Sequence, residues 1–443
     1  MVNVIIPTPL RKYTNNQAEA RVDGKTIQEV LGQLVTTYPN LKNNLFDEKG
    51  EIRAFINIFV EDENIRDLDK EKTVLHENSS VSLVPAIAGG SEGCCSQDRP
   101  SQSKKEDIPF TPEEMNRYSR HFAIPEFNME GQKKLKAAKV LVIGAGGLGC
   151  PILQYLSAAG VGTIGIVDND VVDESNLQRQ VLFAVSDVGK PKVDIAKNKI
   201  LALNPYIQVK TYNAKLTSQN ALDIIKDYDV VVDGTDNFPT RYLVNDACVL
   251  LNKPNVYGSV FRFEGQVSVF NYRDKDGKRG PNYRCLYAAP PPAGLVPNCA
   301  EGGILGVLPG IIGSFQVNEV IKIITGIGEP LSGRLVIFDA LTFKIRILKV
   351  LKDENNPLNG KNPTITKLID YEQFCGVQTQ SPQKEDQIKE ITVQELKSKM
   401  DKKEPFQLID VREQFEYDIV NLNGELVPLS QVENNPELLS CRI

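Results

Sequence analysis

A glycine-rich turn between an apolar strand and a helix constrains the fold of this chain more than any other feature. The apolar segment KVLVI occupies 139–143, GAGGLG follows at 144–149, and the helical pattern CPILQYLSAAG comes next. Glycines at such a turn let backbone N–H groups and the helix N-terminus face a phosphate at close range. The segment therefore predicts a nucleotide site to which Gly144, Gly146 and Gly147 contribute.

Strands and helices alternate around this turn. TIGIVDND, IQVKTYNA and DVVVDGTDN read as strands, and VDIAKNKILALNP reads as a helix. This alternation predicts an α/β fold with a doubly wound, Rossmann-like parallel sheet. Asp168 ends the second strand, where an acid that binds ribose is expected. A single G-x-G-x-x-G fits an NAD-dependent oxidoreductase equally well, so the turn alone leaves the ligand open.

Polar residues after Asp168 favour ATP over NAD. Ser175, Asn176, Gln178 and Arg179 follow soon after it, and then come Lys190, Lys192, Asp236 and Asn237. Arginine and lysine can clamp a triphosphate, and a carboxylate can hold Mg²⁺. Hydride transfer requires no such clamp. Either lysine alone could be an ordinary surface residue, but in this order with Arg179 and Asp236 they indicate an ATP site.

The region 110–376 resembles the ubiquitin-activating-type adenylyltransferases of sulfur-carrier proteins, the MoeB/ThiF family. The resemblance rests on RYSRH, GAGGLGCP, VDNDVVDESNLQRQ, GKPK, DGTDNFPTRYLVNDAC, EGQVSVF and PNCAEGG. It implies a cytoplasmic homodimeric enzyme that uses ATP and Mg²⁺ to adenylate the C-terminal glycine carboxylate of a ubiquitin-like carrier. It also implies that the nucleotide is held by Gly147, Asp168, Ser175, Asn176, Leu177, Gln178, Arg179, Lys192, Asp236 and Asn237.

The same resemblance implies particular roles for a few residues. Asp236 would hold Mg²⁺ and act in catalysis with Arg179 and Lys192. Arg120 would reach the active site of the partner subunit, and Cys299 would take part in sulfur or acyl transfer, for which a thiolate is a suitable nucleophile. Cys150 and Cys248 lie in predicted helices, so we expect them in the core.

The resemblance breaks at the structural zinc that many members of this family hold in two C-x-x-C pairs. The corresponding positions here are Asn282 with Cys285, and Glu372 with Cys375. Two thiolates do not complete a tetrahedral site. We therefore expect no zinc.

Residues 1–90 resemble the ubiquitin-like sulfur carriers, through VIIPTPLRKYT, RAFINIFVEDENIR and VPAIAGG. The pattern predicts a β-grasp domain with a helix capped by Thr26 and strands that begin near Met1, Ile52 and Ser79. In such a carrier Gly90 would bear a thiocarboxylate. Here the Gly90 carboxyl group is in a peptide bond to Ser91, so we expect a protease to cut after Gly90 before this domain can be a substrate. A separate carrier is the other possibility.

The remaining segments are polar or incomplete. Residues 91–109 and 377–388 have linker composition, and the first contains Cys94 and Cys95. Residues 389–443 resemble an incomplete rhodanese domain, with Cys441-Arg442 where a persulfide loop would begin. The persulfide donor is therefore expected to be an external protein.

Charge and hydropathy exclude several classes of partner. The net charge of −6 gives no reason to expect nucleic-acid or membrane binding. The eight cysteines have irregular spacing, which does not indicate a disulfide framework. The apolar stretch 302–328 is interrupted by Pro309, Asn318, Glu319 and Lys322, which predicts a buried or dimer-forming helix. A non-catalytic alternative stays open, in which the fused carrier domain occupies the adenylation site. The sequence leaves the pathway open among cysteine, molybdopterin, thiamine and tRNA thiolation.

Overall fold

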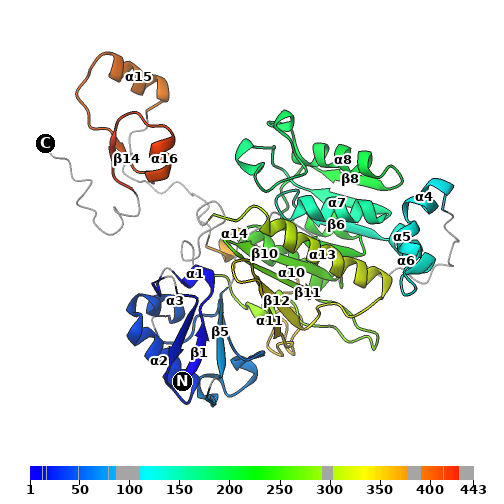
Figure 1. Ribbon diagram of the computed structural model, residues 1–443, viewed down its shortest axis with the longest axis horizontal. Helices are drawn as coiled ribbons and strands as arrows, with labels where there is room; N and C mark the ends of the chain where they lie inside the picture. Colours follow the sequence, from blue (N-terminus) through cyan, green and yellow to red (C-terminus); the bar gives the residue numbers. More distant parts are fainter. Residues whose placement is uncertain are drawn as a thin grey trace. The chain divides into compact units, whose positions relative to one another are not determined.

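The computed structural model describes residues 1–85, 110–291, 303–376 and 391–428, apart from positions 12, 16, 48, 78 and 413. Figure 1 shows the chain, which divides into two compact units, 1–379 and 380–443. Several predictions fall outside the described residues, namely those on Gly90, Ser91, Cys94, Cys95, Cys299 and Cys441.

The N-terminal domain is a five-stranded sheet with strand order β2-β1-β5-β3-β4. Its strands are β1 (Val2–Ile5), β2 (Glu19–Val22), β3 (Ile56–Val60), β4 (Glu63–Asn64) and β5 (Ser80–Pro85). Helix α2 (Ile27–Thr37) begins behind Thr26, whose side chain accepts a hydrogen bond from the Glu29 N–H, as predicted. The first strand ends at Ile5, because Pro7 lacks an N–H for the ladder and the short helix α1 (Thr8–Arg11) follows.

The central domain contains an eight-stranded sheet with strand order β13-β12-β11-β10-β9-β6-β7-β8. The strands are β6 (Lys139–Ile143), β7 (Thr163–Val167), β8 (Gln208–Tyr212), β9 (Val230–Asp233), β10 (Asn255–Phe261), β11 (Glu264–Phe270), β12 (Arg334–Asp339) and β13 (Lys344–Lys349). The parallel half, β8 to β10, confirms the predicted Rossmann-like sheet. An antiparallel extension, β11 to β13, was not foreseen from the alternation.

Helices cover the parallel strands and position the site (Figure 1). They are α6 (Asn128–Ala137), α7 (Gly149–Ala159), α8 (Lys192–Leu203), α9 (Ala221–Ile225), α10 (Phe238–Leu250) and α13 (Leu308–Thr325). Shorter helices are α4 (Pro112–Arg117), α5 (Ser119–Phe122), α11 (Tyr283–Leu286) and α14 (Tyr371–Phe374).

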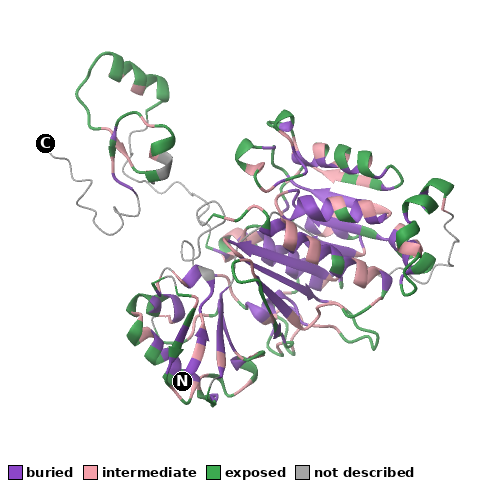
Figure 2. Cartoon of the chain, viewed as in Figure 1, coloured by how far each residue is buried: buried purple, intermediate pink, exposed green. Residues whose placement is uncertain are grey.

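Helix α13 accounts for the long apolar stretch. It lies against β10 and β11 so closely that a Cβ on Gly265 would be 2.3 Å from Ile312 Cδ1. Much of the helix is therefore buried, as Figure 2 shows for the centre of this domain. Among the described residues, no helix combines the length and apolar character needed to cross a membrane.

The C-terminal unit is small in its described part. Helix α15 (Val393–Asp401) is capped by Thr392 as predicted, and β14 (Ile409–Asp410) pairs in parallel with β15 (Glu425–Leu426) beside α16 (Gln414–Ile419). Helix α15 has no buried residue, and apolar side chains such as Val393 and Ile419 are 79% exposed. Its described residues thus bury little apolar surface (Figure 2).

Candidate nucleotide site

The glycine turn is shaped by two of its glycines and leaves open space at a third. Gly144 has φ +87°, a left-handed conformation. A Cβ on Gly149 would lie 1.9 Å from the Gly144 carbonyl oxygen, so no side chain fits there. A Cβ on Gly146 would have only Gln180 Nε2 nearby, at 3.7 Å. The turn thus presents the backbone of Gly146 and the N-terminus of α7 to open space, where a phosphate group fits.

Asp168 holds this turn in place. Its Oδ2 accepts a hydrogen bond from the Ala145 N–H and its Oδ1 accepts one from the Asp170 N–H, each at 2.8 Å. The residue is 4% exposed, and burial raises the pKa of its carboxyl group, against the lowering effect of Lys192. Each carboxylate oxygen of Asp168 has room to accept a second hydrogen bond, for example from a ribose hydroxyl. Contact with a ribose stays a prediction.

Lys192, and not Lys190, points into the site. Lys192 opens α8, its side chain is 4% exposed, and its Nζ lies 2.9 Å from Asp170 Oδ2. Lys190 is exposed and donates to the Ser186 carbonyl instead. The bridge between Val171 and Pro191 closes this loop and brings α8 beside Asp170. Sequence reasoning missed Asp170, although a second acid two residues beyond Asp168 at the same strand end was a signal.

Asp236 is the carboxylate best suited to a cation. It follows β9, and its side chain opens to solvent. The protein around it nevertheless removes much of the water that would stabilise its negative charge, and this desolvation raises the pKa of Asp236; the hydrogen bond from Asn237 opposes the shift, and the Asp170 carboxylate adds to it. A partly desolvated carboxylate gains from a nearby divalent cation, so this position fits Mg²⁺.

A buried arginine supports the loop that carries Asp236. Arg241 Nη2 donates to the Thr235 carbonyl at 2.6 Å and to the Gly258 carbonyl at 3.3 Å. Its guanidinium lies 4.8 Å from the centre of the Tyr257 ring. Arg241 is fully buried, and sequence reasoning gave it no role because arginine is seldom found in a core.

The segment from Ser175 to Arg179 lies beside the glycine turn. A Cβ on Gly147 would be 3.6 Å from Arg179 Cγ, and Arg179 Nη1 donates to the Ser175 carbonyl at 3.2 Å. Asn176 Oδ1 accepts a hydrogen bond from Gln180 Nε2 at 3.0 Å. The exposed Gln178 lies close to Gly306, and Leu177 packs against the core. The structure therefore places Arg179 and the neighbouring residues predicted to bind the nucleotide on one side of the turn.

Two further predicted residues have observed structural settings. Asn237 is the N-cap of α10, and its Oδ1 accepts a hydrogen bond from the Thr240 N–H at 3.0 Å. Arg120 lies exposed on α5, and its contact with a partner subunit stays a prediction. Cys150 and Cys248 are buried in α7 and α10, as predicted for core thiols.

The positions of the absent zinc ligands are filled by hydrogen bonds. Cys285 Sγ accepts from Asn356 Nδ2 at 3.1 Å, and Asn356 Nδ2 also donates to Asn282 Oδ1 at 3.1 Å. Cys375 lies near the Arg284–Asp246 ion pair, and burial raises its pKa to about 12. Within the described ranges, no three His, Cys, Asp or Glu side chains form a possible metal centre. The expectation of no zinc stays a prediction.

Comparisons with known families identify both domains. The ThiS family model matches residues 4–90, and the ThiF family model matches residues 118–359, more than half of the chain. The chain belongs to the ThiF family. Its N-terminal part is a ThiS-type, ubiquitin-like domain, here called the ThiS-like domain, and the region 110–376 is called the ThiF domain.

Several named relatives share most of this chain. The "Probable adenylyltransferase/sulfurtransferase MoeZ" of Mycobacterium tuberculosis is 52% identical over 327 residues, covering 74% of this chain and 82% of that protein. The "Sulfur carrier protein adenylyltransferase" of Thermus thermophilus is 52% identical over 268 residues, 60% of this chain and 99% of that protein. The "Adenylyltransferase and sulfurtransferase MOCS3" of Culex quinquefasciatus is 48% identical over 328 residues, covering 73% of this chain and 74% of that protein.

One solved structure shares the fold of a large part of this chain. Escherichia coli MccB superposes with a TM-score of 0.50 at 24% identity, covering 57% of this chain and 75% of MccB. At this identity the likeness concerns the fold alone.

Proposed function

We propose that this protein is an adenylyltransferase that activates the C-terminal glycine carboxylate of a ubiquitin-like sulfur carrier with MgATP. The observation that carries the proposal is the grouping of the glycine turn, Lys192, Arg179 and Asp236 at one edge of the parallel sheet. The names of the relatives, which include adenylyltransferases of sulfur-carrier proteins, support the same reaction.

The reaction needs positioning and charge neutralisation more than acid–base catalysis. A carboxylate oxygen of the carrier attacks the α-phosphorus of ATP, the bond to the β-phosphate oxygen breaks, and pyrophosphate leaves. The carboxylate is already a nucleophile, so no proton has to be removed. The N–H groups at the start of α7 would bind phosphate oxygens, while Lys192 and Arg179 would neutralise the departing pyrophosphate.

Magnesium would be held at Asp236, where it supplies positive charge to the phosphates. Arg241 keeps the Asp236 loop in position through the Thr235 carbonyl. Asp170 holds Lys192 by an ion pair in the free protein. When a triphosphate binds, Lys192 would exchange this carboxylate for phosphate oxygens.

The ThiS-like domain is a candidate substrate of the same chain. The Pro85 carbonyl at the end of β5 accepts a hydrogen bond from Tyr287 Oη at 3.2 Å. The ring of Tyr287 contacts Tyr283, which contacts Tyr257, the ring on which Arg241 rests. Gly90 is five positions after Pro85 in the sequence, a separation that a fully extended chain spans in at most about 18 Å. The domain thus ends on the side of the ThiF domain that supports the Asp236 loop.

The sulfur-transfer step and its partners extend this proposal. A protease would release the Gly90 carboxylate from Ser91. The outer sulfur of an external protein persulfide would then attack the acyl-adenylate and displace AMP, and a thiol would cleave the resulting acyl disulfide, which leaves the thiocarboxylate on the carrier and a disulfide between the two thiols. Cys299 would take part in that transfer, and Arg120 would complete the site across a homodimer. Cytoplasmic location fits a chain with eight cysteines.

Nucleotide-dependent thermal stability tests the proposed ligand. MgATP at a hundredfold excess over its dissociation constant would stabilise the ThiF domain by about 2.7 kcal/mol, whereas NAD would not. Lys192→Ala should lose most of this stabilisation, while Lys190→Ala, the matched control, should retain it because Lys190 points away. Stabilisation by NAD and not by MgATP would overturn the assignment.

A further inference from the structure

The outer face of the ThiS-like sheet is buried where an isolated β-grasp sheet would meet water. The strand register places Asn57, Phe59, Ser82 and Val84 on this face, opposite the face that carries Val81 and Leu83. All four residues are at most 1% exposed. Strands β3 and β5 are therefore covered on both sides, and something other than the domain's own helix covers the outer side.

The cover is the antiparallel extension of the ThiF sheet. The register of β11, β12 and β13 places Gln266, Ile337 and Arg346 on one face, and Gly265 on the opposite face packs against α13. The apolar cluster that contains the core of the ThiS-like domain also contains Leu335, Ile337 and Leu348. The two sheets thus pack on each other through a continuous apolar layer. Figure 1 shows the blue ThiS-like domain beside the part of the ThiF domain labelled β12 and α11.

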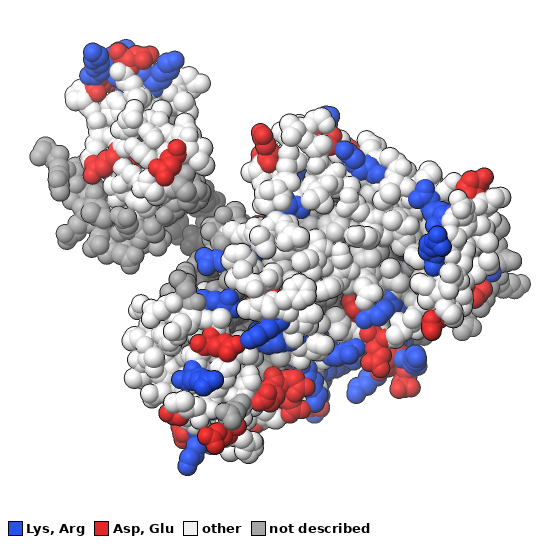
Figure 3. Space-filling view, in the orientation of Figure 1, with Lys and Arg blue, Asp and Glu red and all other residues white. Residues whose placement is uncertain are grey.

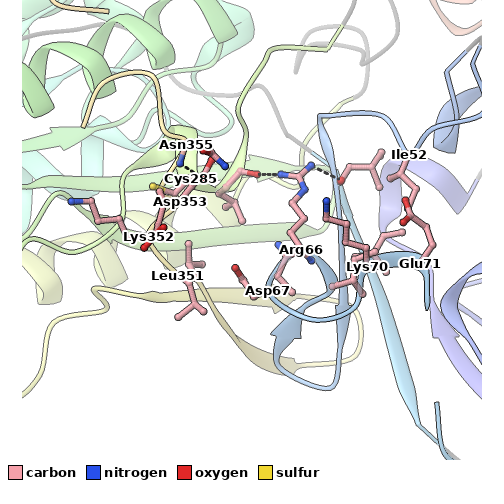
Figure 4. Close-up of a pocket in the computed structure, with 17 residues that line it drawn as sticks. Ile52, Arg66, Asp67, Lys70, Glu71, Cys285, Leu351, Lys352, Asp353 and Asn355 are labelled. Atoms are coloured by element: carbon pink, nitrogen blue, oxygen red, sulfur yellow. Dashed lines mark hydrogen bonds between the residues drawn. The ribbon is translucent and has the colours of Figure 1, made fainter. Parts of the chain in front are cut away.

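Buried polar contacts fix the alignment of these two faces. Asn57 Nδ2 donates to the Leu286 carbonyl at 2.7 Å, and its Oδ1 accepts from Asn64 Nδ2 at 2.9 Å. Arg66 lines a cavity of about 570 Å³ (Figure 4), and its Nη1 donates to the same Leu286 carbonyl at 3.2 Å. Arg346 Nη1 donates to Ser82 Oγ at 2.7 Å. Because a buried amide without a partner is destabilising, Asn57 specifies this docked arrangement over others.

Opposite charges meet around the rim of the apolar layer. Glu19 pairs with Lys344 at 2.9 Å and Glu63 pairs with Lys349 at 2.7 Å. Arg11 of the ThiS-like domain lies 3.4 Å from Asp339, and these two side chains are only 14% and 18% exposed. In the view of Figure 3, acidic and basic side chains lie side by side on the visible face of the unit 1–379, and this face has no extended patch of one sign. The domains are therefore matched in charge as well as in shape.

We propose that the chain's own ThiS-like domain, which lies on the β11–β13 face, keeps a separate ubiquitin-like carrier from that face and so inhibits the ThiF domain until it is displaced. This inference rests on the proposed function, because displacement of the fused domain matters only if the ThiF domain adenylates a separate carrier. Covalent connection gives the fused domain an effective concentration in the millimolar range for short linkers. The fused domain would accordingly exclude a separate carrier that binds with micromolar affinity.

Cutting the full chain between the domains tests the docking itself. A site for a specific protease is introduced within 91–109, and the cut protein is passed through a size-exclusion column at micromolar concentration. The two pieces should elute together. The pair Glu19→Lys and Glu63→Lys should weaken their association at least tenfold, and adding Lys344→Glu and Lys349→Glu should restore it. These four side chains are 44% to 64% exposed, so the fold should tolerate their exchange. Separation of the unmodified pieces, or no change in the reversed variant, would overturn the proposal.

An activity measurement separates this proposal from the proposed function. Ser82→Arg places a second guanidinium against Arg346 and should release the fused domain. ATP–pyrophosphate exchange with an added ThiS-family carrier that ends in a free Gly-Gly should then rise at least fivefold over the unmodified chain. Equal exchange by both chains would contradict exclusion by the fused domain. Absence of exchange in both would refute the adenylation reaction, while the elution test would still decide the docking.

Discussion

The buried ion pair between Arg284 and Asp246 should be the strongest single polar determinant of stability in the ThiF domain. Arg284 Nε and Nη2 donate to the two Asp246 carboxylate oxygens, each at 2.7 Å, and the side chains are 1% and 0% exposed. Tyr371 Oη donates to Asp246 Oδ2 at 2.9 Å. The guanidinium lies between the rings of Tyr242 and Phe374, 4.8 and 4.7 Å from their centres. The pair thus joins α10, α11 and α14.

Asp246→Asn removes the negative charge and leaves the Arg284 guanidinium buried without a counter-charge. Loss of one partner of a buried pair costs about 3–5 kcal/mol of unfolding free energy. For a domain of this size that corresponds to a fall in Tm on the order of 10 °C. Because an amide has only one oxygen, one of the two hydrogen bonds from Arg284 is lost in either orientation of the new side chain, and the measured loss contains both the charge and that hydrogen bond.

Thermal unfolding of the full chain, followed by circular dichroism, measures this effect. Glu372→Gln is the matched control. Glu372 lies on α14 beside Tyr371, and the change breaks its half-exposed ion pair with Lys215, which should alter stability by less than about 1 kcal/mol. A fall in Tm of less than 2 °C for Asp246→Asn would refute the reasoning. An equal fall for both variants would show that the loss is not specific to the buried pair.

The remaining predictions concern the glycine turn, the metal carboxylate and the buried thiols. Gly146→Ala should keep the Tm but weaken MgATP binding, whereas Gly149→Ala should lower the Tm as well, because its Cβ would overlap the Gly144 carbonyl; equal Tm values would contradict this. The raised pKa of Asp236 means that the folded chain binds this proton more tightly than the unfolded chain, so its charge lowers stability as the pH rises through that pKa. Asp236→Asn should therefore raise the Tm at pH 7 and abolish activity, and an unchanged or lower Tm would count against the desolvation. Burial raises the pKa of Cys150 to about 12, so iodoacetamide at pH 8 should leave it unmodified until the chain unfolds, as peptide mass spectrometry can show; rapid labelling of the native chain would contradict it.

The parallel half of the fold and the position of the glycine turn could be predicted from local patterns. Apolar runs separated by helical segments report directly on which residues a parallel sheet buries. The antiparallel strands were harder, because EGQVSVF at β11 carries three polar residues, and Ser268 among them has its hydrogen-bond partner on β12, 66 residues further along the chain. Their pairing depends on tertiary contacts that a local pattern does not contain.

The site residues divide along the same line. Asp168 and Asp236 follow from their positions after strands. The family resemblance already indicated Lys192 rather than Lys190, and the loop closed by Val171 and Pro191 gives the physical reason for it. Arg241 was missed because its burial depends on two carbonyl groups from separate places, Thr235 after β9 and Gly258 within β10. The docking face did leave a signal: INIFV in β3 is almost continuously apolar, which is typical of a strand buried on both faces.

The most direct test of adenylation is ATP–pyrophosphate exchange by the purified chain with a ThiS-family carrier that ends in a free Gly-Gly. We predict carrier-dependent exchange that Asp236→Ala abolishes and that Cys299→Ala retains, because the thiol is needed only after the acyl-adenylate has formed. The absence of exchange in the Ser82→Arg chain, in which the docking surface is free, would contradict the assignment of this protein as a sulfur-carrier adenylyltransferase.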